Sequence, residues 1–204
     1  EIVMFIEKPP SRIHKEKRLV HGIGINDANY VVDYQENGMR VCCPYYKVWK
    51  GLLDRCFDAT FHKKRPSYKG CTVVSDWLIF SNFKSWMQTQ NWENKALDKD
   101  LLNWANKQYG PDTCLFITPA LNNLLTLRNN ARGDLPLGVS RLVIKGYAYY
   151  VASCSFYGKQ KRLGYFKTVE EAAEAYKTAK LNYIKELAEA EQDPRIKQAL
   201  LALH

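Results

Sequence analysis

The chain has 204 residues, a length that suits one large domain or two small ones and that is ample for a buried core. Its 46% hydrophobic and 13% aromatic residues exclude a disordered or low-complexity chain. Thirty Lys and Arg against 21 Asp and Glu give a formal net charge of +9, which suits a polyanionic partner such as nucleic acid.

No stretch reaches the roughly 18–20 uninterrupted apolar residues that a membrane span needs, so we expect no membrane partner. The residues before Lys8 are too few and too acidic for a signal peptide. Because the sequence starts with Glu1 and not with Met, we expect further residues to precede it in the gene product. These features predict a cytoplasmic protein.

Six cysteines are spread between Cys42 and Cys154, and no C-x-x-C pair occurs among them. This spacing is not typical of zinc ligands, and disulfide scaffolds are usually shorter and denser in Cys. We therefore expect reduced, mostly buried thiols and no zinc site built from cysteine.

The first third of the chain predicts a basic arm followed by a helix. Residues 8–20 combine a Pro-Pro pair with basic residues and show no apolar periodicity, which predicts a flexible arm over residues 1–21. Residues 22–26 contain two glycines but neither a third glycine nor a following helix, which indicates a turn and not a phosphate-binding loop. Behind Pro44, apolar residues at helical spacing predict an amphipathic helix of about 12–14 residues.

The middle of the chain predicts short elements in the order strand, helix, strand, strand, helix. Residues 61–70 form a basic loop in this interpretation and residues 71–74 a short strand. The aromatic spacing over residues 77–87 favours a helix with a buried face over a platform that stacks on bases. A strand at 97–102 and another at 114–117 precede a helix that opens at Thr118-Pro119.

The last third predicts a separate unit after an Asn- and Gly-rich linker at residues 127–134. Its predicted strands are 137–144, 147–157 and 160–166, joined by tight turns at Lys145-Gly146 and Gly158-Lys159. Thr168 and Glu171 form a capping box that starts a long helix, and Asp193-Pro194 opens a short final helix. The fold class is therefore α+β.

The predicted sheet has two different faces. In its middle strand the even positions Tyr150, Ala152, Cys154 and Phe156 are apolar or small, so we expect them to pack on the long helix and the odd positions to face water or a ligand. Residues 138–167 include six basic residues and no acidic one. A sheet with an apolar back and a basic front can lie in a DNA major groove. The alternative is an ordinary α+β domain with a solvated basic face.

The residues of this unit also carry a resemblance to a known family. The run Leu-Gly-Tyr-Phe at 163–166, followed by Thr-Val-Glu-Glu-Ala-Ala-Glu-Ala-Tyr at 168–176, closely resembles the plant ethylene-response-factor (APETALA-type) DNA-binding domain, which also occurs in phage homing endonucleases. The resemblance implies, for residues 137–204, a three-stranded antiparallel sheet packed on a long helix, with double-stranded DNA as partner. The plant domains have Arg, Glu and Trp at several contact positions where this chain has Ser and Gln, so their sequence preference is not carried over. The DNA-binding residues predicted from the resemblance, the charge and the face are Ser140, Arg141, Lys145, Tyr149, Ser153, Ser155, Lys159, Gln160, Lys161 and Arg162.

A second resemblance covers the strand–strand–helix segment. The runs Leu-Asp-Lys-Asp at 97–100 and Tyr-Gly-Pro-Asp-Thr-Cys at 109–114, with Asn122-Asn123, resemble the divergent HNH nucleases of phages. The resemblance implies a ββα-metal nuclease domain with flanking helices over residues 22–127, followed by a linker at 128–136. It implies Mg²⁺ or Mn²⁺ as the cofactor, which would polarise the scissile phosphate. The predicted metal ligands are Asp98, Asp100, Asn122 and Asn123, and the predicted catalytic residues are Asp98, Lys99 and Asp100.

This chain departs from the nuclease pattern at the general base. Lys99 stands where that family has a histidine, and a Lys with a pKa near 10.4 is a poor base at neutral pH unless burial lowers it. One hypothesis is therefore a phage-type, metal-dependent, site-directed DNA endonuclease or nickase of the homing type, acting in the host cytoplasm. The alternative is a degenerate nuclease fold that binds DNA as a repressor or anti-host factor. A third hypothesis is a basic sheet that binds an acidic protein partner, including a DNA mimic.

Overall fold

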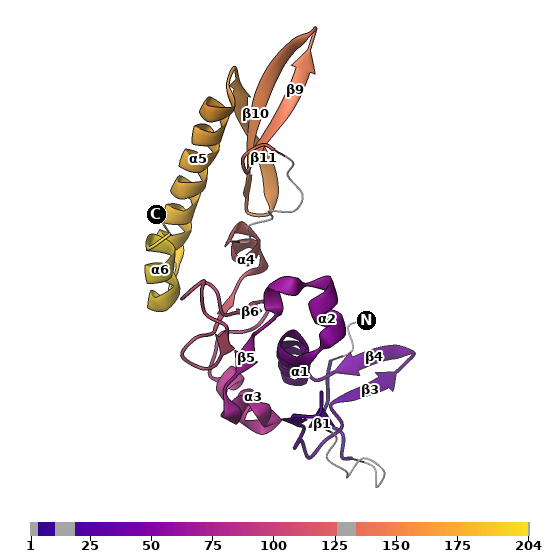
Figure 1. The fold of residues 1–204 in the computed structure, drawn as a ribbon. Helices are drawn as coiled ribbons and strands as arrows, with labels where there is room; N and C mark the ends of the chain where they lie inside the picture. Colours follow the sequence, from indigo (N-terminus) through magenta and orange to yellow (C-terminus); the bar gives the residue numbers. More distant parts are fainter. Residues whose placement is uncertain (1–3, 11–18, 126–133, 204) are drawn as a thin grey trace. The chain divides into compact units, whose positions relative to one another are not determined.

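The structure, a computed structural model, describes residues 4–10, 19–125 and 134–203. The chain forms two compact units, an N-terminal unit of residues 1–117 and a C-terminal unit of residues 118–204, and each is described by itself (Figure 1). Within the described residues, no helix has both the length and the apolar composition to cross a bilayer. The mixture of helices and antiparallel strands confirms the α+β class.

The N-terminal unit consists of short strand pairs around helices. Its helices are α1 (Pro44–Phe57), α2 (Ala59–Lys64) and α3 (Phe80–Gln88), with 3-10 turns η2 (Pro66–Tyr68) and η3 (Ser75–Leu78). Its antiparallel pairs are β1 (Leu19–Val20) with β2 (Gly24–Ile25), β3 (Asp33–Glu36) with β4 (Met39–Cys42), and β6 (Ala96–Asp98) with β8 (Leu115–Ile117). The strands β5 (Thr72–Val73) and β7 (Gln108–Tyr109) pair in parallel.

An aromatic core joins α1 to α3. The ring of Trp49 is fully buried against Phe80, at a centroid distance of 5.4 Å, and its indole N–H donates to the Trp77 carbonyl oxygen at 2.7 Å. Phe83 and Met87 complete the buried face of α3. The predicted helices and the buried face at residues 77–87 are therefore confirmed.

Two predictions for this unit need correction, and one hairpin was not predicted. Residues 4–10 are not a free arm, because the Phe5 ring lies 6.0 Å from that of Tyr30 and the Lys8 carbonyl accepts from the Val31 N–H at 2.9 Å; residues 11–18 lie outside the described ranges. The basic segment at 61–70 is α2 and η2, since the Asp58 carboxylate caps α2. The β3–β4 hairpin escaped prediction although Asn37-Gly38 is a strong turn signal, with φ values of 51° and 73°.

The thiols are as predicted. All six cysteines are free, and five are buried while Cys42 is half-buried. Burial raises the pKa of the Cys56 thiol to about 12 and that of Cys114 to about 11. Both thiols therefore stay protonated and unreactive at neutral pH.

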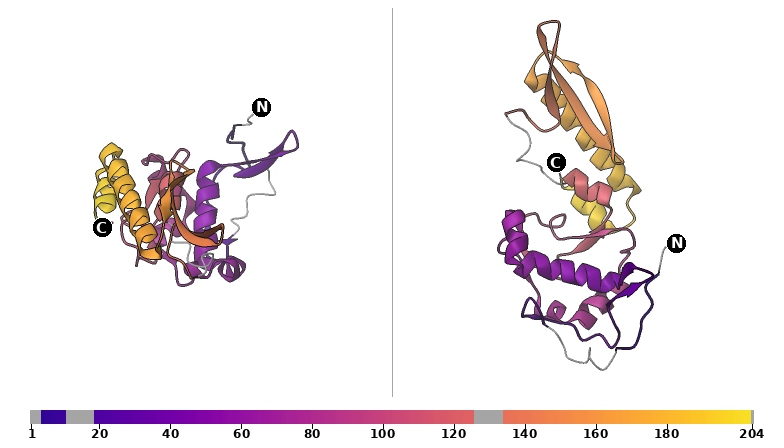
Figure 2. Two further views of the ribbon diagram at one scale, coloured as in Figure 1. Left: turned by 90° about the horizontal axis from the view of Figure 1, so that it is seen from above. Right: turned by 90° about the vertical axis from the view of Figure 1, so that its right-hand side faces the viewer.

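The C-terminal unit contains a three-stranded antiparallel sheet that packs on one long helix (Figure 2). Its strand order is β11 (Lys159–Phe166), β10 (Tyr147–Phe156), β9 (Val139–Ile144). Its helices are α4 (Pro119–Leu125), α5 (Val169–Ala190) and α6 (Pro194–Leu201). The Thr168 capping box and the Asp193 cap are both present. The predicted linker at 127–134 lies outside the described residues except for Asp134.

The second hairpin turn lies one residue earlier than predicted. Lys145-Gly146 is confirmed, with φ values of 49° and 84°, but the other turn is Tyr157-Gly158, with 48° and 78°. This places Gly158 second in the pair, as in Lys145-Gly146. The Tyr157 N–H donates to the Tyr183 hydroxyl of α5 at 2.7 Å, a non-local contact that stabilises the unusual tyrosine conformation.

Candidate functional site

The strand register assigns each sheet residue to one of two faces. Directly opposite residues of an antiparallel pair lie on the same face, and Phe156 faces α5 because its ring lies 5.0 Å from that of Tyr183. We call the face away from α5 the front face. Val151 lies on it, opposite Ser140 and Tyr165. By the same register the front face holds Ser140, Leu142, Ile144, Tyr147, Tyr149, Val151, Ser153, Ser155, Gln160, Arg162 and Tyr165.

The predicted basic front is wrong in part. In the strand register Arg141 lies opposite Tyr150, Lys159 opposite Phe156 and Lys161 opposite Cys154. Because these three partners are even positions of β10, which face α5, the three basic residues lie on the α5 side of the two edge strands. Of the predicted basic residues, only Arg162 lies on the front face within the strands, and Lys145 lies in the β9–β10 turn. The front face therefore combines polar, aromatic and aliphatic side chains with a single arginine.

The odd positions of β10 are also not all open to water. Val151 is only 6% exposed, because β10 is the central strand and side chains of both edge strands flank it. Ser155, Gln160 and Arg162 are exposed, as predicted. The Arg162 guanidinium donates to the Tyr165 hydroxyl and lies 5.1 Å from that ring. This pairing holds the one front-face arginine over the sheet.

The positive charge of the sheet is not neutralised. No acidic residue occurs between 138 and 167, and among the described residues none of the basic side chains of β9, β10, β11 and their turns forms an ion pair. These side chains are all exposed. The sheet therefore presents uncompensated charge along both edge strands and at the β9–β10 turn.

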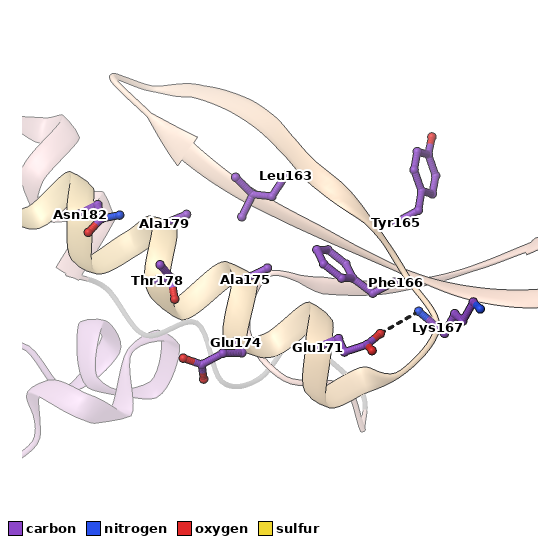
Figure 3. Close-up of a pocket in the computed structure, with 10 residues that line it drawn as sticks. All are labelled: Leu163, Tyr165, Phe166, Lys167, Glu171, Glu174, Ala175, Thr178, Ala179 and Asn182. Atoms are coloured by element: carbon purple, nitrogen blue, oxygen red, sulfur yellow. Dashed lines mark hydrogen bonds between the residues drawn. The ribbon is translucent and has the colours of Figure 1, made fainter.

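The side of the sheet that faces α5 is visible in Figure 3. Leu163 and Phe166 of β11 point towards Ala175 and Ala179 of α5 around a groove of about 1020 Å³, whereas Tyr165 points the other way. The Lys167 N–H donates to the Glu171 carboxylate at 3.2 Å, where β11 leads into the helix. Phe166 and Tyr165 thus lie on the opposite faces that the register assigns to them, and a β-bulge at Leu163 interrupts the alternation along β11.

At the end of β10, beyond the start of β9, a pocket of about 430 Å³ opens. Ser153, Ser155 and Gln160 line it from the sheet, and Asn123 lines it from α4. Asn123 was predicted as a metal ligand. Within its own unit it lies beside the predicted DNA-binding serines.

In the N-terminal unit, Asp98 closes the turn that follows β6. One of its carboxylate oxygens, Oδ1, accepts the backbone N–H of Asp100 at 3.0 Å and that of Leu101 at 2.8 Å. Burial raises the pKa of the Asp98 carboxyl, and the negative charge of Asp100 adds to this effect, while the N–H of Leu101 opposes it. The ionised carboxylate is thus held in surroundings that disfavour its charge.

Lys99 is the one polar or charged side chain in the buried set of the described residues, at 5% exposure. Its ammonium donates to the Asp100 carboxylate and to the Asn106 carbonyl oxygen at 3.0 Å, and it lies 5.8 Å from the Tyr109 ring centroid. In this arrangement Lys99 is a hydrogen-bond donor that fastens the turn of residues 99–109. It offers no free lone pair to a water molecule.

Replacing Lys99 with methionine is expected to lower the free energy of unfolding of the N-terminal unit by about 1–3 kcal/mol. Methionine fills a similar volume but leaves the Asn106 carbonyl without its donor, whereas Asp100 is exposed and turns to water. Urea unfolding followed by tryptophan fluorescence measures the change. A Lys47→Met variant, at an exposed position of α1, is the control; equal losses would contradict a fastening role for Lys99.

The predicted metal ligands are divided between the two units. Asp98 ends β6 and Asp100 follows it, while Asn122 and Asn123 lie on α4 in the C-terminal unit. Carboxylate and amide oxygens are donors that suit Mg²⁺ or Mn²⁺. Asp98 has a second oxygen, Oδ2, for which the described residues show no partner, whereas a cation at Asp100 has to displace the Lys99 ammonium. The donor types therefore fit such a cation, with Lys99 as its competitor.

One cluster of ligand-type side chains was not foreseen from the sequence. His21 in the β1–β2 turn and Asp54 and Asp58 at the end of α1 have ligand-type atoms within 4.8 Å of one another. His21 Nε2 lies 2.6 Å from Asp54 Oδ1, which also accepts from the Lys50 ammonium at 2.9 Å. Asp58 caps α2. Its carboxylate accepts the backbone N–H groups of Phe61 and Thr60, and these hydrogen bonds lower the pKa of that carboxyl. No motif spacing links residues that are 33 positions apart, so only the fold reveals this group.

The chain was also compared with known proteins. Nothing matched it among family models, curated proteins or solved structures. The functional conclusion therefore depends on the residues of the sheet and of the β6 turn.

Proposed function

We propose that the C-terminal unit binds double-stranded DNA through the front face of its sheet. The observation that carries this proposal is an exposed sheet without acidic residues whose basic side chains have no ion-pair partner among the described residues. A β-sheet of this width can enter the major groove, where each base pair shows a distinct pattern of donors and acceptors. The resemblance to the APETALA-type domain supports the same partner.

The two groups of residues take different roles in this proposal. Ser153, Ser155 and Gln160 offer short polar groups for base edges, and Arg162 suits bidentate contact with guanine. The basic residues of the edge strands and of the β9–β10 turn lie at the rims of the sheet and bind phosphates. They are Arg141, Lys145, Lys159 and Lys161. Their position at the edges and on the α5 side of the sheet suits contacts with phosphates and not with base edges.

Replacing Arg162 with alanine is expected to weaken binding to a selected duplex by about tenfold and to relax specificity at one base pair. Replacing Lys159 and Lys161 with serine weakens binding to all sequences and lowers the slope of log K against log salt by about 2. Fluorescence anisotropy with duplexes selected from a random pool measures both effects. Lys177→Ser with Lys185→Ser, which removes two exposed charges from α5, is the control.

Unchanged affinity and salt slope in both sheet variants, or an equal effect of the α5 control, would overturn the proposal. If Arg162→Ala abolishes capture of an acidic protein and leaves DNA affinity unchanged, the sheet binds protein instead. Circular dichroism of each variant confirms that the sheet is retained.

We further propose that the N-terminal unit is a divergent HNH-type endonuclease domain that cuts DNA in the host cytoplasm. Asp98 and Asp100 of this unit would hold Mg²⁺ or Mn²⁺, and the metal would supply polarisation of the scissile phosphate when bound. Burial raises the pKa of the Asp98 carboxyl, and raised pKa values are common among functional carboxyls. We assign Lys99 the role of positioning Asp100 and the turn, because its ammonium donates hydrogen bonds to the Asp100 carboxylate and to the Asn106 carbonyl oxygen.

One observation favours a binding-only alternative. The Lys99 ammonium occupies the Asp100 carboxylate, so a predicted metal ligand is already neutralised. A degenerate nuclease fold of this kind would act as a DNA-binding repressor or anti-host factor, with a possible protein partner.

Cleavage decides between these two functions. Supercoiled plasmid that carries the selected site is incubated with the full chain and Mg²⁺ or Mn²⁺, and nicked and linear products are separated on a gel. We expect products that depend on the metal and disappear in Asp98→Ala. No cleavage by wild type leaves the binding-only function, whereas cleavage that persists in Asp98→Ala overturns the assignment of Asp98 to the cleavage site.

A further inference from the structure

The N-terminal unit carries a second concentration of positive charge, apart from the sheet. No acidic residue occurs between positions 59 and 75. Lys63 and Lys64 end α2, Arg65 follows it, and Lys69 follows η2; all four side chains are exposed. Within the described part of the chain none of them forms an ion pair.

These bases project from a fixed backbone. The Asp58 carboxylate caps α2 through the Thr60 and Phe61 N–H groups at 2.7 and 3.2 Å. The Phe61 ring meets Tyr68 of η2 edge-on at 5.4 Å, and His62 Nε2 lies 2.8 Å from the Arg55 carbonyl oxygen of α1. Basic residues on a fixed backbone lose less conformational entropy on binding than those of a flexible tail.

A second segment joins this surface. Lys107 donates through its ammonium to the Ser67 carbonyl oxygen at 2.8 Å, and its own carbonyl accepts the Thr72 N–H at 2.8 Å. The turn that precedes β7 therefore lies against η2 and β5. Lys107 adds a further positive charge, and among the described residues it forms no ion pair.

Trp104 lies in this turn, three residues before Lys107. Its side chain is 86% exposed, the highest value among the large hydrophobic side chains described. In the described structure it makes no ring contact with another aromatic residue, unlike the other four tryptophans, which contact neighbouring rings. An indole this exposed, in the same turn as Lys107, is open to stacking by a planar ligand.

We propose that this surface, formed by Lys63, Lys64, Arg65, Lys69, Trp104 and Lys107, binds an unpaired stretch of nucleic acid. The indole of Trp104 stacks on one base, and the lysines and arginine contact the flanking phosphates. Stacking on a tryptophan requires a base that has left its own stack, so the surface selects single strands and opened duplex over intact duplex. The inference rests on the proposed function only in taking nucleic acid as the partner, because it uses different residues.

The test measures binding of the full chain to labelled oligothymidylate of about 12 nucleotides, a length within the range that small stacking surfaces occupy. Trp104→Ala is expected to weaken binding by about tenfold, and Trp104→Tyr to restore part of the loss, because a smaller ring still stacks. Since the side chain is exposed, the thermal midpoint stays unchanged in both variants.

The charge contribution is tested by Lys63→Ser, Lys64→Ser and Arg65→Ser together. This triple variant is expected to lower the salt slope for oligothymidylate by about 2, at about 0.7 per phosphate contact. The matched control is Lys177→Ser, Lys185→Ser and Lys197→Ser, which removes three exposed charges from α5 and α6. Equal slopes for the two triple variants would show only the effect of net charge and would overturn the proposal.

The two proposals fail separately. Loss of duplex binding in Arg162→Ala with oligothymidylate binding intact supports a second surface. Oligothymidylate binding by wild type that is lost in Trp104→Ala upholds this inference even if no duplex binds. Unchanged affinity in Trp104→Ala, or no measurable oligothymidylate binding by wild type, overturns it whatever the duplex result.

Discussion

Replacing Gly138 with alanine is expected to destabilise the C-terminal unit by about 2–4 kcal/mol. Gly138 directly precedes β9 and has φ of 77°, a conformation that L side chains rarely adopt, and an added Cβ atom would lie 2.0 Å from a ring carbon of Tyr176. The Gly138 carbonyl also accepts the Ser153 N–H at 2.8 Å, so a shifted backbone weakens the sheet edge. Strain and overlap therefore add at one position.

Gly146→Ala separates these two causes. Gly146 has φ of 84°, but an added Cβ atom would meet nothing within 4 Å, so only the conformational cost of about 1 kcal/mol remains. All five tryptophans lie in the N-terminal unit, so tyrosine fluorescence or hydrogen exchange must follow the C-terminal one. The tryptophan transition should not move in either variant. Equal losses for Gly138→Ala and Gly146→Ala would contradict the close approach of Tyr176.

The elements that the sequence predicts well have their causes within a few residues. Pro44 at the first turn of α1 and the Thr168–Glu171 capping box each fix a helix start through local backbone groups. Lys145-Gly146 fixes a hairpin for the same reason. Such local signals can be interpreted without the rest of the fold, and the structure confirms all three.

The predictions that failed depend on contacts between distant residues. The turn at Tyr157-Gly158 has the support of Tyr183, 26 residues away. The face on which Arg141 lies follows from its pairing with Tyr150 across a hairpin, and a one-residue difference in register reverses the face. Charge counted along the chain therefore located the basic sheet but not the side of the sheet on which each base lies.

The candidate site shows the same division. The sequence indicates Asp98, Lys99 and Asp100 as a group, and the structure adds what spacing does not reveal, namely that Lys99 is buried and pairs with Asp100. Trp104 was not singled out, although a lone tryptophan among Asn and Lys residues is a signal for exposure. The exposure of Trp104 and the pairing of Lys99 are properties of the fold, so the roles of these residues could not be predicted from the sequence.

Replacing Asp98 with asparagine is expected to stabilise the N-terminal unit at pH 7, by a few tenths to about 1 kcal/mol. The amide keeps an oxygen that accepts the Asp100 and Leu101 N–H groups but carries no charge into the half-buried turn. Urea unfolding followed by tryptophan fluorescence measures the gain. Asp112→Asn, at an exposed position before β8, is the control and should change little.

The pH dependence has a definite sign. Because burial raises the folded pKa of Asp98 above its ordinary value of 3.8, the folded state binds the proton more tightly than the unfolded state. The resulting contribution to stability is complete below that value and is lost as pH rises through the raised pKa. The difference between Asp98→Asn and wild type should therefore be smallest in acid and reach its full size at neutral pH. A loss of stability at pH 7 would contradict burial as the cause.

The Asp98→Asn variant tests stability and cleavage together. If Asp98 holds the metal, Asp98→Asn gains stability while metal-dependent cleavage falls by at least about a hundredfold, since an amide neutralises no charge on the cation. A stability gain with cleavage unchanged would show that the strained carboxylate serves neither metal nor chemistry. A carboxylate that lowers stability at neutral pH has no structural advantage over asparagine in this turn, so the gain together with the loss of cleavage would identify Asp98 as a functional group.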